Sequence, residues 1–147
     1  MIIQINTKDG IKDINTNSYE AWYDEYLDLN SSKEIKISTI NTKTEILITD
    51  GFSYGNKIFG CDATDIQNYS GLLLKKDRLT QLNMYPYKVK CKCNSDYYEI
   101  QDADEMDTFT DTIFVYIATI RKSGWDLIDA VNDCDTIQCV FEVEDDR

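Results

Sequence analysis

Hydrophobic residues recur at alternating steps of three and four along residues 102–135, the longest periodic stretch of the chain. The positions that carry this pattern are Met106, Phe109, Ile113, Tyr116, Ile117, Ile120, Leu127, Ile128 and Val131. Such steps place side chains on one face of an α-helix. We therefore predict a long helix over residues 102–135, with Gly124 as a candidate break.

The N-terminal part of the chain has other periods. Residues 2–7 and 11–15 are rich in β-forming residues and flank an Asp-Gly pair, which predicts a β-hairpin. Residues 18–29 carry aromatic side chains at helical spacing, which predicts a helix that packs through one aromatic face. Residues 34–39 and 44–49 alternate between hydrophobic and polar positions, which predicts a second pair of strands.

A turn at Asp50-Gly51 separates this part from the next. Residues 52–59 have the pattern of a short hairpin around a Gly-Asn pair. Residues 62–82 have a helical pattern, with Asp62 or Thr64 as the candidate N-cap. The side chains that we expect to be buried on this helix are Ile66, Tyr69, Leu73 and Leu79.

A lysine-rich stretch precedes the long helix. Hydrophobic and basic residues alternate along residues 85–93, which predicts a strand, and residues 97–100 are predicted to be the strand that pairs with it. The turn of this hairpin is predicted at Asn94-Ser95-Asp96. The residues expected on one face of its first strand are Tyr87, Val89, Cys91 and Cys93. The end of the chain, residues 136–147, is predicted to be a short strand-like run with an acidic tail.

The order of these elements is typical of an α+β fold. It consists of a β-rich N-terminal module with a short helix, then a helix, a β-hairpin and a long helix. We place a boundary near residue 50, where the β-rich pattern ends. Residues 1–50 then form the first module, and residues 51–147 form a helix–hairpin–helix domain with an acidic C-terminal tail.

The excess of acidic residues lies in the second part of the chain. The 147 residues include 15 basic and 27 acidic ones, a formal net charge of −12. Residues 94–147 hold 15 of the acids and only three bases, whereas residues 1–93 are balanced. Because such a surface repels phosphate groups, we expect no nucleic-acid partner. We interpret it as a solvated face, with a basic protein partner or a cation-rich environment as the alternative.

The chain has no pattern typical of export or membrane insertion. The initial hydrophobic run ends at Gln4, and no stretch approaches 18 hydrophobic residues, so we expect neither a signal peptide nor a membrane-spanning helix. Five cysteines without an export signal favour reduced thiols in a cytosol.

Four of the cysteines are candidate zinc ligands, because thiolates bind zinc in a tetrahedral arrangement. They are Cys91, Cys93, Cys134 and Cys139. Their spacings differ from the usual pairs separated by two residues, and burial in a core explains Cys91 and Cys93 without a metal. A disulfide between Cys91 and Cys134 stays open from the sequence. We predict no metal site.

Acidic residues cluster at the start of the long helix and on one of its faces. Those at the start are Asp102, Asp104, Glu105, Asp107 and Asp111. An EF-hand loop needs glycine at its sixth and glutamate at its twelfth position, which Asp107 and Ile113 hold here, so this template fails. We interpret the acids as favouring a helix N-terminus. Asp126, Asp129 and Asp133 are expected on a solvated face.

Catalytic signatures are missing from the sequence. The chain has no histidine, no glycine-rich phosphate loop, and no serine or cysteine nucleophile with a visible base partner. We therefore predict no enzyme activity, no catalytic residue and no cofactor. A hydrolase that uses carboxylates alone is the remaining enzymatic alternative.

Five motifs follow one another from residue 51 to about residue 135: GFSYGNKIFGCD, SGLLLKKDRL, a lysine-rich hairpin, DADEM and GWDLIDAVNDC. Their order resembles a small domain of unknown function in the tail fibre and tail-tip proteins of tailed bacteriophages. Tyr85, Tyr87 and Tyr98 stand in the hairpin where that domain usually has tryptophan. The resemblance implies a structural role in the virion after synthesis in a bacterial cytoplasm, other tail proteins as partners, homo-oligomers that are commonly trimers, and a docking role for residues 1–50.

The long helix supplies the candidate interface. Read as a heptad repeat, its seam consists of Met106, Phe109, Ile113, Tyr116, Ile120 and Leu127. This seam packs either against sister chains or against the chain's own sheet. We predict a structural component of the phage tail, tail fibre or its attachment region. The alternatives are a tail fibre assembly factor that is absent from the mature particle, and a host-directed acidic protein that mimics nucleic acid.

Overall fold

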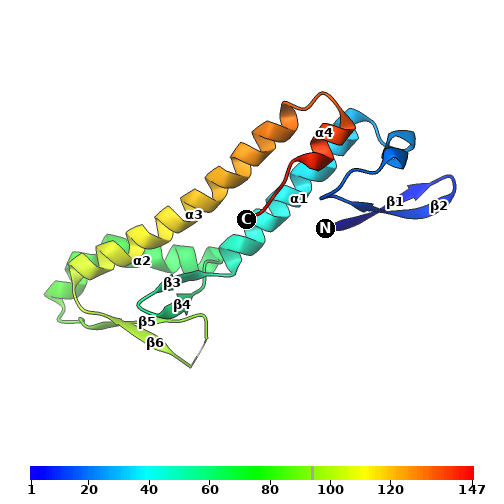
Figure 1. Ribbon diagram of the computed structural model, residues 1–147. Coiled ribbons are helices and arrows are strands. Elements are labelled where there is room, and N and C mark those ends of the chain that lie inside the picture. The colour runs from blue at the N-terminus through cyan, green and yellow to red at the C-terminus, as the bar shows by residue number, and fades with distance from the viewer. Residues whose placement is uncertain (94) are drawn as a thin grey trace. The chain divides into compact units, whose positions relative to one another are not determined.

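The computed structural model describes residues 1–93 and 95–147, which form four α-helices, one 3-10 helix and three two-stranded antiparallel sheets (Figure 1). The predicted α+β fold is confirmed. The chain divides into two compact units: unit 1 contains residues 1–44 and 121–147, and unit 2 contains residues 45–120. The C-terminal segment therefore groups with the N-terminal residues, whereas a boundary near residue 50 placed the two in different domains.

Unit 1 begins with the predicted hairpin of β1 (Ile2–Thr7) and β2 (Gly10–Asn15). Thr7 pairs with Gly10, so the loop between the strands contains two residues. Gly10 has a φ of +108°, a conformation that side-chain-bearing residues rarely adopt, which is why glycine stands at the end of this turn. Ile14 of β2 is fully buried and anchors the hairpin in unit 1.

A 3-10 helix, η1 (Ala21–Glu25), replaces the longer helix that we predicted over residues 18–29. Tyr23 is fully buried, and its ring packs edge-to-face on Phe141 at a centroid distance of 5.1 Å. Its hydroxyl oxygen accepts a hydrogen bond from the backbone N–H of Asn15 at 2.9 Å. No side chain caps η1. Because short uncapped helices are marginal, these contacts of Tyr23 hold the segment.

Helix α1 (Leu29–Thr49) occupies the segment in which we predicted strands over residues 34–39 and 44–49, so that prediction is wrong. The buried side chains follow helical spacing and are Ser32, Lys36, Thr39, Ile40, Thr44 and Ile48. Most of them are polar, so a hydrophobic pattern does not reveal this face. The period-two alternation of the isoleucines was therefore a misleading signal.

The buried polar residues of α1 have partners within unit 1. Lys36 is 1% exposed, and its ammonium group donates a hydrogen bond to the carbonyl of Thr16 at 2.5 Å. The hydroxyl of Thr44 donates to the carbonyl of Ile40 at 2.9 Å. Asp28 caps the helix, since its carboxylate accepts from a backbone N–H of the first turn at 2.7 Å. Such pairing allows a helix face to bury polar side chains.

The C-terminal segment forms helix α4 (Ile137–Glu142), where we predicted a strand-like run. Thr136 caps it by accepting a hydrogen bond from the backbone N–H of Cys139 at 3.1 Å. Val140 and Phe141 are both fully buried, in two hydrophobic clusters of unit 1. A strand would direct these neighbouring side chains to opposite faces, so burial of both favours the helix.

The last residues are anchored, although we expected an acidic tail. The guanidinium of Arg147 pairs with the carboxylate of Asp145 at 2.7 Å and donates hydrogen bonds to the hydroxyl of Thr44 at 2.8 Å and the carbonyl of Ile40 at 3.2 Å. The ammonium of Lys43 lies 3.4 Å from Asp145. Burial raises the pKa of Asp145, but Arg147 and Lys43 outweigh this effect and hold the pKa below its ordinary value.

Unit 2 begins with the last residues of α1, whose Ile48 belongs to its core. The hairpin of β3 (Phe52–Tyr54) and β4 (Lys57–Phe59) and then helix α2 (Ala63–Gln81) follow, which confirms both predictions. Asp62 is the N-cap of α2. Its side chain accepts a hydrogen bond from the backbone N–H of Asp65 at 2.8 Å, and the Asp65 side chain accepts from the backbone N–H of Asp62 at 3.3 Å. This reciprocal capping box fixes the start of the helix.

The buried stripe of α2 differs from the predicted one at a single position. Tyr69 and Leu79 are buried, and Ile66 packs against the same core while partly exposed. Leu72, rather than the predicted Leu73, is the leucine that contacts this core. The two leucines are adjacent, so the sequence alone could not decide between them.

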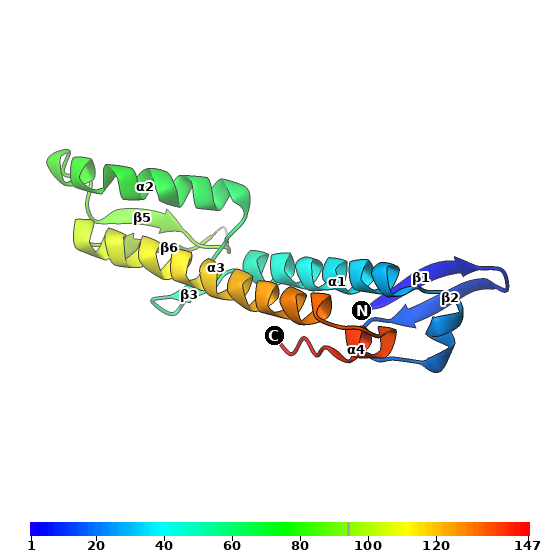
Figure 2. The same ribbon diagram turned by 90° about the horizontal axis from the view of Figure 1, so that it is seen from above.

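A second hairpin consists of β5 (Tyr87–Lys90) and β6 (Tyr97–Ile100), as predicted. Seen from above, β5 lies between β6 and α2 (Figure 2). The predicted turn includes Asn94, which lies outside the described residues. Cys91 is buried but Cys93 is exposed, so the predicted shared face ends before Cys93.

Helix α3 (Ala103–Asn132) confirms the predicted long helix and continues without interruption through Gly124. A β-carbon at Gly124 would lie 2.7 Å from the hydroxyl of Thr44, so glycine permits a close approach here. Asp102 caps the helix by accepting a hydrogen bond from the backbone N–H of Glu105 at 2.8 Å. The interpretation of these acids as helix-start residues is therefore confirmed for Asp102.

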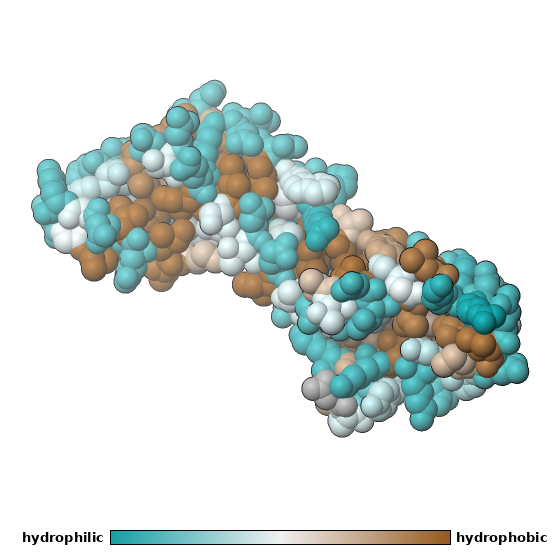
Figure 3. Space-filling model, turned by 180° about the vertical axis from the view of Figure 1, so that it is seen from behind, coloured by the Kyte–Doolittle hydropathy of each residue, from teal (hydrophilic) through white to brown (hydrophobic). Residues whose placement is uncertain are grey.

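The face drawn in Figure 3 is largely hydrophilic, with hydrophobic residues between the polar ones. Exposed hydrophobic side chains among the described residues include Leu74 at 82% and Trp125 at 61%. Single exposed hydrophobic side chains are normal on protein surfaces, so they do not by themselves locate an interface.

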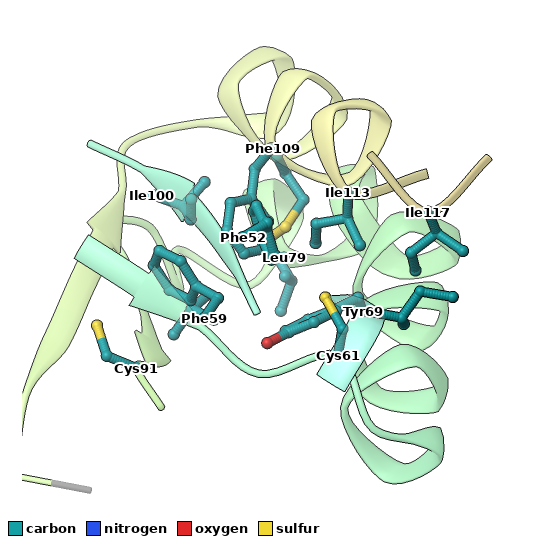
Figure 4. Close-up of a cluster of buried hydrophobic side chains, with 13 residues drawn as sticks. Phe52, Phe59, Cys61, Tyr69, Leu79, Cys91, Ile100, Phe109, Ile113 and Ile117 are labelled. Atoms are coloured by element: carbon teal, nitrogen blue, oxygen red, sulfur yellow. The ribbon is translucent and has the colours of Figure 1, made fainter. Parts of the chain in front are cut away.

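The core of unit 2 is built around an aromatic cluster (Figure 4). The ring of Phe109 lies 5.7 Å from Phe52, 5.0 Å from Phe59 and 5.5 Å from Tyr69, between ring centroids. The long helix, the first hairpin and α2 thus meet at Phe109. Val89 packs into the same core and brings β5 to the flank of α2.

Candidate functional site

The predicted interface seam lies in the interior or at its margin. Met106, Phe109 and Ile113 are at most 1% exposed and belong to the core of unit 2. Tyr116 and Ile120 are partly buried against that core, and Leu127 is partly buried in a cluster of unit 1. The first three side chains therefore offer no surface to a sister chain. Of the two alternatives for this seam, the structure favours packing within the chain.

The expectation of reduced thiols is wrong for Cys134 and Cys139, which form a disulfide. The turn between α3 and α4 brings their Cα atoms to 5.6 Å, a separation that a disulfide can span. These two residues are therefore not available as zinc ligands or as a partner for Cys91. Within residues 1–93 and 95–147, no group of three or more acidic or cysteine side chains is arranged to hold a metal ion.

The acidic residues at the start of α3 have structural partners. The carboxylate of Glu105 accepts a hydrogen bond from the hydroxyl of Tyr98 at 2.7 Å and from the backbone N–H of Gln101 at 2.7 Å. This hydrogen bond raises the pKa of Tyr98 to about 12, because a phenolate would lose it and repel Glu105. These contacts tie the second hairpin to α3. Asp126, Asp129 and Asp133 are exposed, as predicted.

A polar pocket of about 320 Å³ lies beside the start of α2 in unit 2. It is lined by Thr49, Gly60, Cys61, Asp62, Asp65, Lys90, Cys91 and Lys92. Burial raises the pKa of Cys61 to about 11, so its thiol is protonated at neutral pH. Asp62 and Asp65 cap α2, and the ammonium of Lys92 donates to the carbonyl of Asp50 at 2.9 Å. Asp62, Asp65 and Lys92 therefore have structural partners.

A groove of about 710 Å³ adjoins this pocket and runs between α2 and β5. Both share Asp65 and Lys90 in their walls. The hydrophobic side of the groove is formed by Tyr69, Leu72, Leu79, Tyr87 and Val89. The basic residues in its lining are Lys75, Lys88 and Lys90, and its single acid is Asp65. Its volume is in the range of ligand-binding sites.

The three lysines of the groove have no ion pair or hydrogen bond with any described residue. Five other basic side chains, in contrast, are paired: Lys43, Lys57, Lys76, Lys122 and Arg147. In a chain with a net charge of −12, an unpaired basic groove is a local reversal of sign. Such a groove attracts negatively charged groups.

One edge of β5 opens toward this groove. The only described strand that pairs with β5 is β6. The backbone N–H of Cys91 donates to Asp96 on the β6 side, so by alternation Lys88 and Lys90 direct their backbone groups to the opposite edge. The backbone N–H of Lys92, next in this series, does point away from β6, because it donates to the carbonyl of Ile58 at 2.9 Å.

Sequence reasoning found part of this site. The alternation of residues 85–93 correctly assigned Lys88 and Lys90 to a face opposite Val89. It did not find Lys75, which comes from α2, because no local pattern shows which strand a helix will flank. The signal that could have pointed to the site was a lysine-rich strand in an acidic chain.

Comparisons with protein-family models, with curated proteins and with solved structures found no match to this chain. The resemblance to the phage tail domain therefore stays a prediction. In the part of the chain that the structure describes, no helix is long and hydrophobic enough to cross a membrane.

Proposed function

We propose that this protein acts by binding other proteins, as a structural component of the tail, tail fibre or attachment region of a tailed bacteriophage virion. The observation that carries the binding role is the groove between α2 and β5. It combines a strand edge that no other described strand covers, a hydrophobic wall and three lysines that have no partner among residues 1–93 and 95–147. The assignment to a phage tail rests on the resemblance of residues 51–135.

A binding role agrees better with the site than a catalytic one. The buried thiol of Cys61 has its pKa raised to about 11 by burial, whereas a cysteine nucleophile needs a lowered pKa. Asp62 and Asp65 are engaged with the first turn of α2. Burial also raises the pKa of Asp65. Each of these groups thus has a structural role that does not require a substrate.

The proposed partners are other tail proteins, and the proposed assembly includes several copies of this chain. Because Met106, Phe109 and Ile113 are buried within one chain, an oligomer would use other surfaces. Light scattering after size exclusion measures this directly: a mass near three times 17.0 kDa would support a fibre-type trimer.

The test of the virion role is quantitative mass spectrometry of particles purified from the phage that encodes this chain. We expect the protein in a fixed ratio to the major capsid protein after density-gradient purification. Presence in infected cells but absence from particles would contradict the structural role and favour the assembly factor. That alternative is also compatible with a groove that binds an extended segment, since an assembly factor holds unfolded or unassembled chains.

A further inference from the structure

We propose that the groove between α2 and β5 binds an extended acidic segment of a partner protein, which adds to β5 as a third strand. This inference rests on the proposed binding function and specifies the chemistry of the partner. It follows from three features of unit 2: the edge of β5 that no other described strand covers, the hydrophobic residues of the groove, and its lysines, which have no partner among the described residues.

The backbone of β5 provides the first element of recognition. Lys88 and Lys90 each direct one N–H and one C=O toward the groove, as the alternation of the β5–β6 ladder requires. An added strand would satisfy these groups by main-chain hydrogen bonds, which give affinity without dependence on sequence. Just beyond β5, the backbone N–H of Lys92 already donates a hydrogen bond to the carbonyl of Ile58 on this side, so the edge can pair with another backbone segment.

Side chains of the groove define the sequence that fits. In an added strand, alternate side chains point to opposite faces. One set would contact the hydrophobic wall that includes Leu72, Tyr87 and Val89, and the other would lie near the ammonium groups of Lys88 and Lys90. The preferred segment therefore has hydrophobic and acidic residues in alternation.

The charge of the groove favours an acidic partner over other occupants. The lining contains three lysines, which have no partner among the described residues, and one carboxylate, that of Asp65, while Glu99 stands opposite Lys88 in the β5–β6 ladder. The positive charge still exceeds the negative charge, so bringing an acidic segment into the groove neutralises charge. Lysines at a sheet edge commonly prevent strand pairing between copies of a protein. The same lysines would permit pairing with a segment whose acidic side chains neutralise them.

A sequence of this kind occurs in the chain itself at residues 141–146, but it is engaged elsewhere. Phe141 is fully buried, and the carboxylate of Asp145 is 5% exposed and pairs with Lys43 and Arg147. Withdrawing this segment would break those contacts. The occupant is therefore a segment of another protein and not the C-terminus of a second copy.

The experiment selects peptides from a displayed library of random hexapeptides on the immobilised full-length chain. A counter-selection uses the variant with Lys75→Gln, Lys88→Gln and Lys90→Gln. We expect enriched peptides to alternate hydrophobic and acidic residues, and to bind the variant at least tenfold more weakly in fluorescence anisotropy. The substitution Lys8→Gln, at an exposed loop of unit 1, is the matched control and should leave binding unchanged.

The strand geometry is tested separately from the charge. Lys90→Pro removes an N–H that β6 does not use, so β5 should still form, whereas Lys90→Gln removes only the charge. We expect Lys90→Pro to weaken binding more than Lys90→Gln, with unchanged circular dichroism for both. The backbone nitrogens of the best peptide form two alternating sets, of which only one would point toward β5. Methylating that set should abolish binding, whereas methylating the other set should not.

Three results would overturn the inference. The first is that no peptide is enriched on the wild type over the triple variant. The second is enrichment of acidic peptides that still bind when either set of alternate backbone nitrogens is methylated. The third is a dimer of the chain that Lys90→Pro dissociates, because a second copy would then occupy the groove. Presence of the protein in purified particles would leave the proposed function standing in each case.

Discussion

Replacing Phe109 with alanine tests the central packing claim, that the periodic face of α3 is a core within one chain. Phe109 is fully buried, and four aromatic rings lie around it at centroid distances of 5.0 to 5.7 Å. Truncating a buried phenylalanine costs about 3–5 kcal/mol, which includes the cavity left behind. We expect a loss of about 4 kcal/mol, a large fraction of a typical stability of about 5–15 kcal/mol.

The measurement is equilibrium urea unfolding followed by far-ultraviolet circular dichroism at two protein concentrations. Phe114→Ala is the matched control, because Phe114 is on the same helix but 40% exposed, and its loss should stay within about 0.5 kcal/mol. A loss below about 1 kcal/mol at Phe109 would refute the burial argument. A wild-type midpoint that rises with protein concentration would show that the chains associate, but it would leave the burial of Phe109 within one chain to be decided by the alanine variant.

Three further predictions concern unit 1 and the thiol of Cys61. Replacing Cys134 and Cys139 together by serine should lower the free energy of unfolding by about 2 kcal/mol, because the short covalent loop restricts the unfolded chain, and a reducing agent should then no longer shift the melting temperature. Arg147→Ala should cost about 3 kcal/mol in urea unfolding, since it removes a partner from a buried carboxylate, and adding Asp145→Asn should restore part of this loss. The raised pKa of Cys61 means that the folded state keeps a proton that the unfolded state releases. The contribution of this thiol to the free energy of unfolding, on the order of 2 kcal/mol, is therefore fully present below pH 9 and is lost as the pH rises toward about 11. Cys61→Ala should flatten this part of the curve of stability against pH.

Local turn and capping chemistry made several elements predictable from the sequence. The Asp-Gly pair at the start of β2 identified the first hairpin, and Gly10 does adopt a positive φ there. Asp62 was expected to cap α2 and does so with Asp65 in a reciprocal arrangement. In these cases the interaction that fixes the element lies within a few residues, so the sequence contains the whole signal.

Elements whose burial depends on distant residues were not predicted correctly. Helix α1 buries Ser32, Lys36 and Thr44, polar residues that a hydrophobic pattern assigns to solvent. Lys36 is buried because the carbonyl of Thr16, twenty residues earlier, accepts its hydrogen bond. The groove between α2 and β5 was not predictable for the same reason, because the sequence showed the lysines of β5 but not which helix lies beside them.

Unit 1 is assembled from the two ends of the chain, and this affects how the protein is made. Unit 2 is continuous from residue 45 to residue 120, so all its residues have been synthesised before those of the second part of unit 1 begin. The ribosome adds about 5–20 residues per second, so residues 121–147 follow roughly 1–5 seconds later. During that interval α1 lacks the cover of α4 and of the anchored Arg147. Unit 2 is then expected to fold before unit 1, and the N-terminal residues to remain exposed to chaperones until residues 121–147 can pack against them.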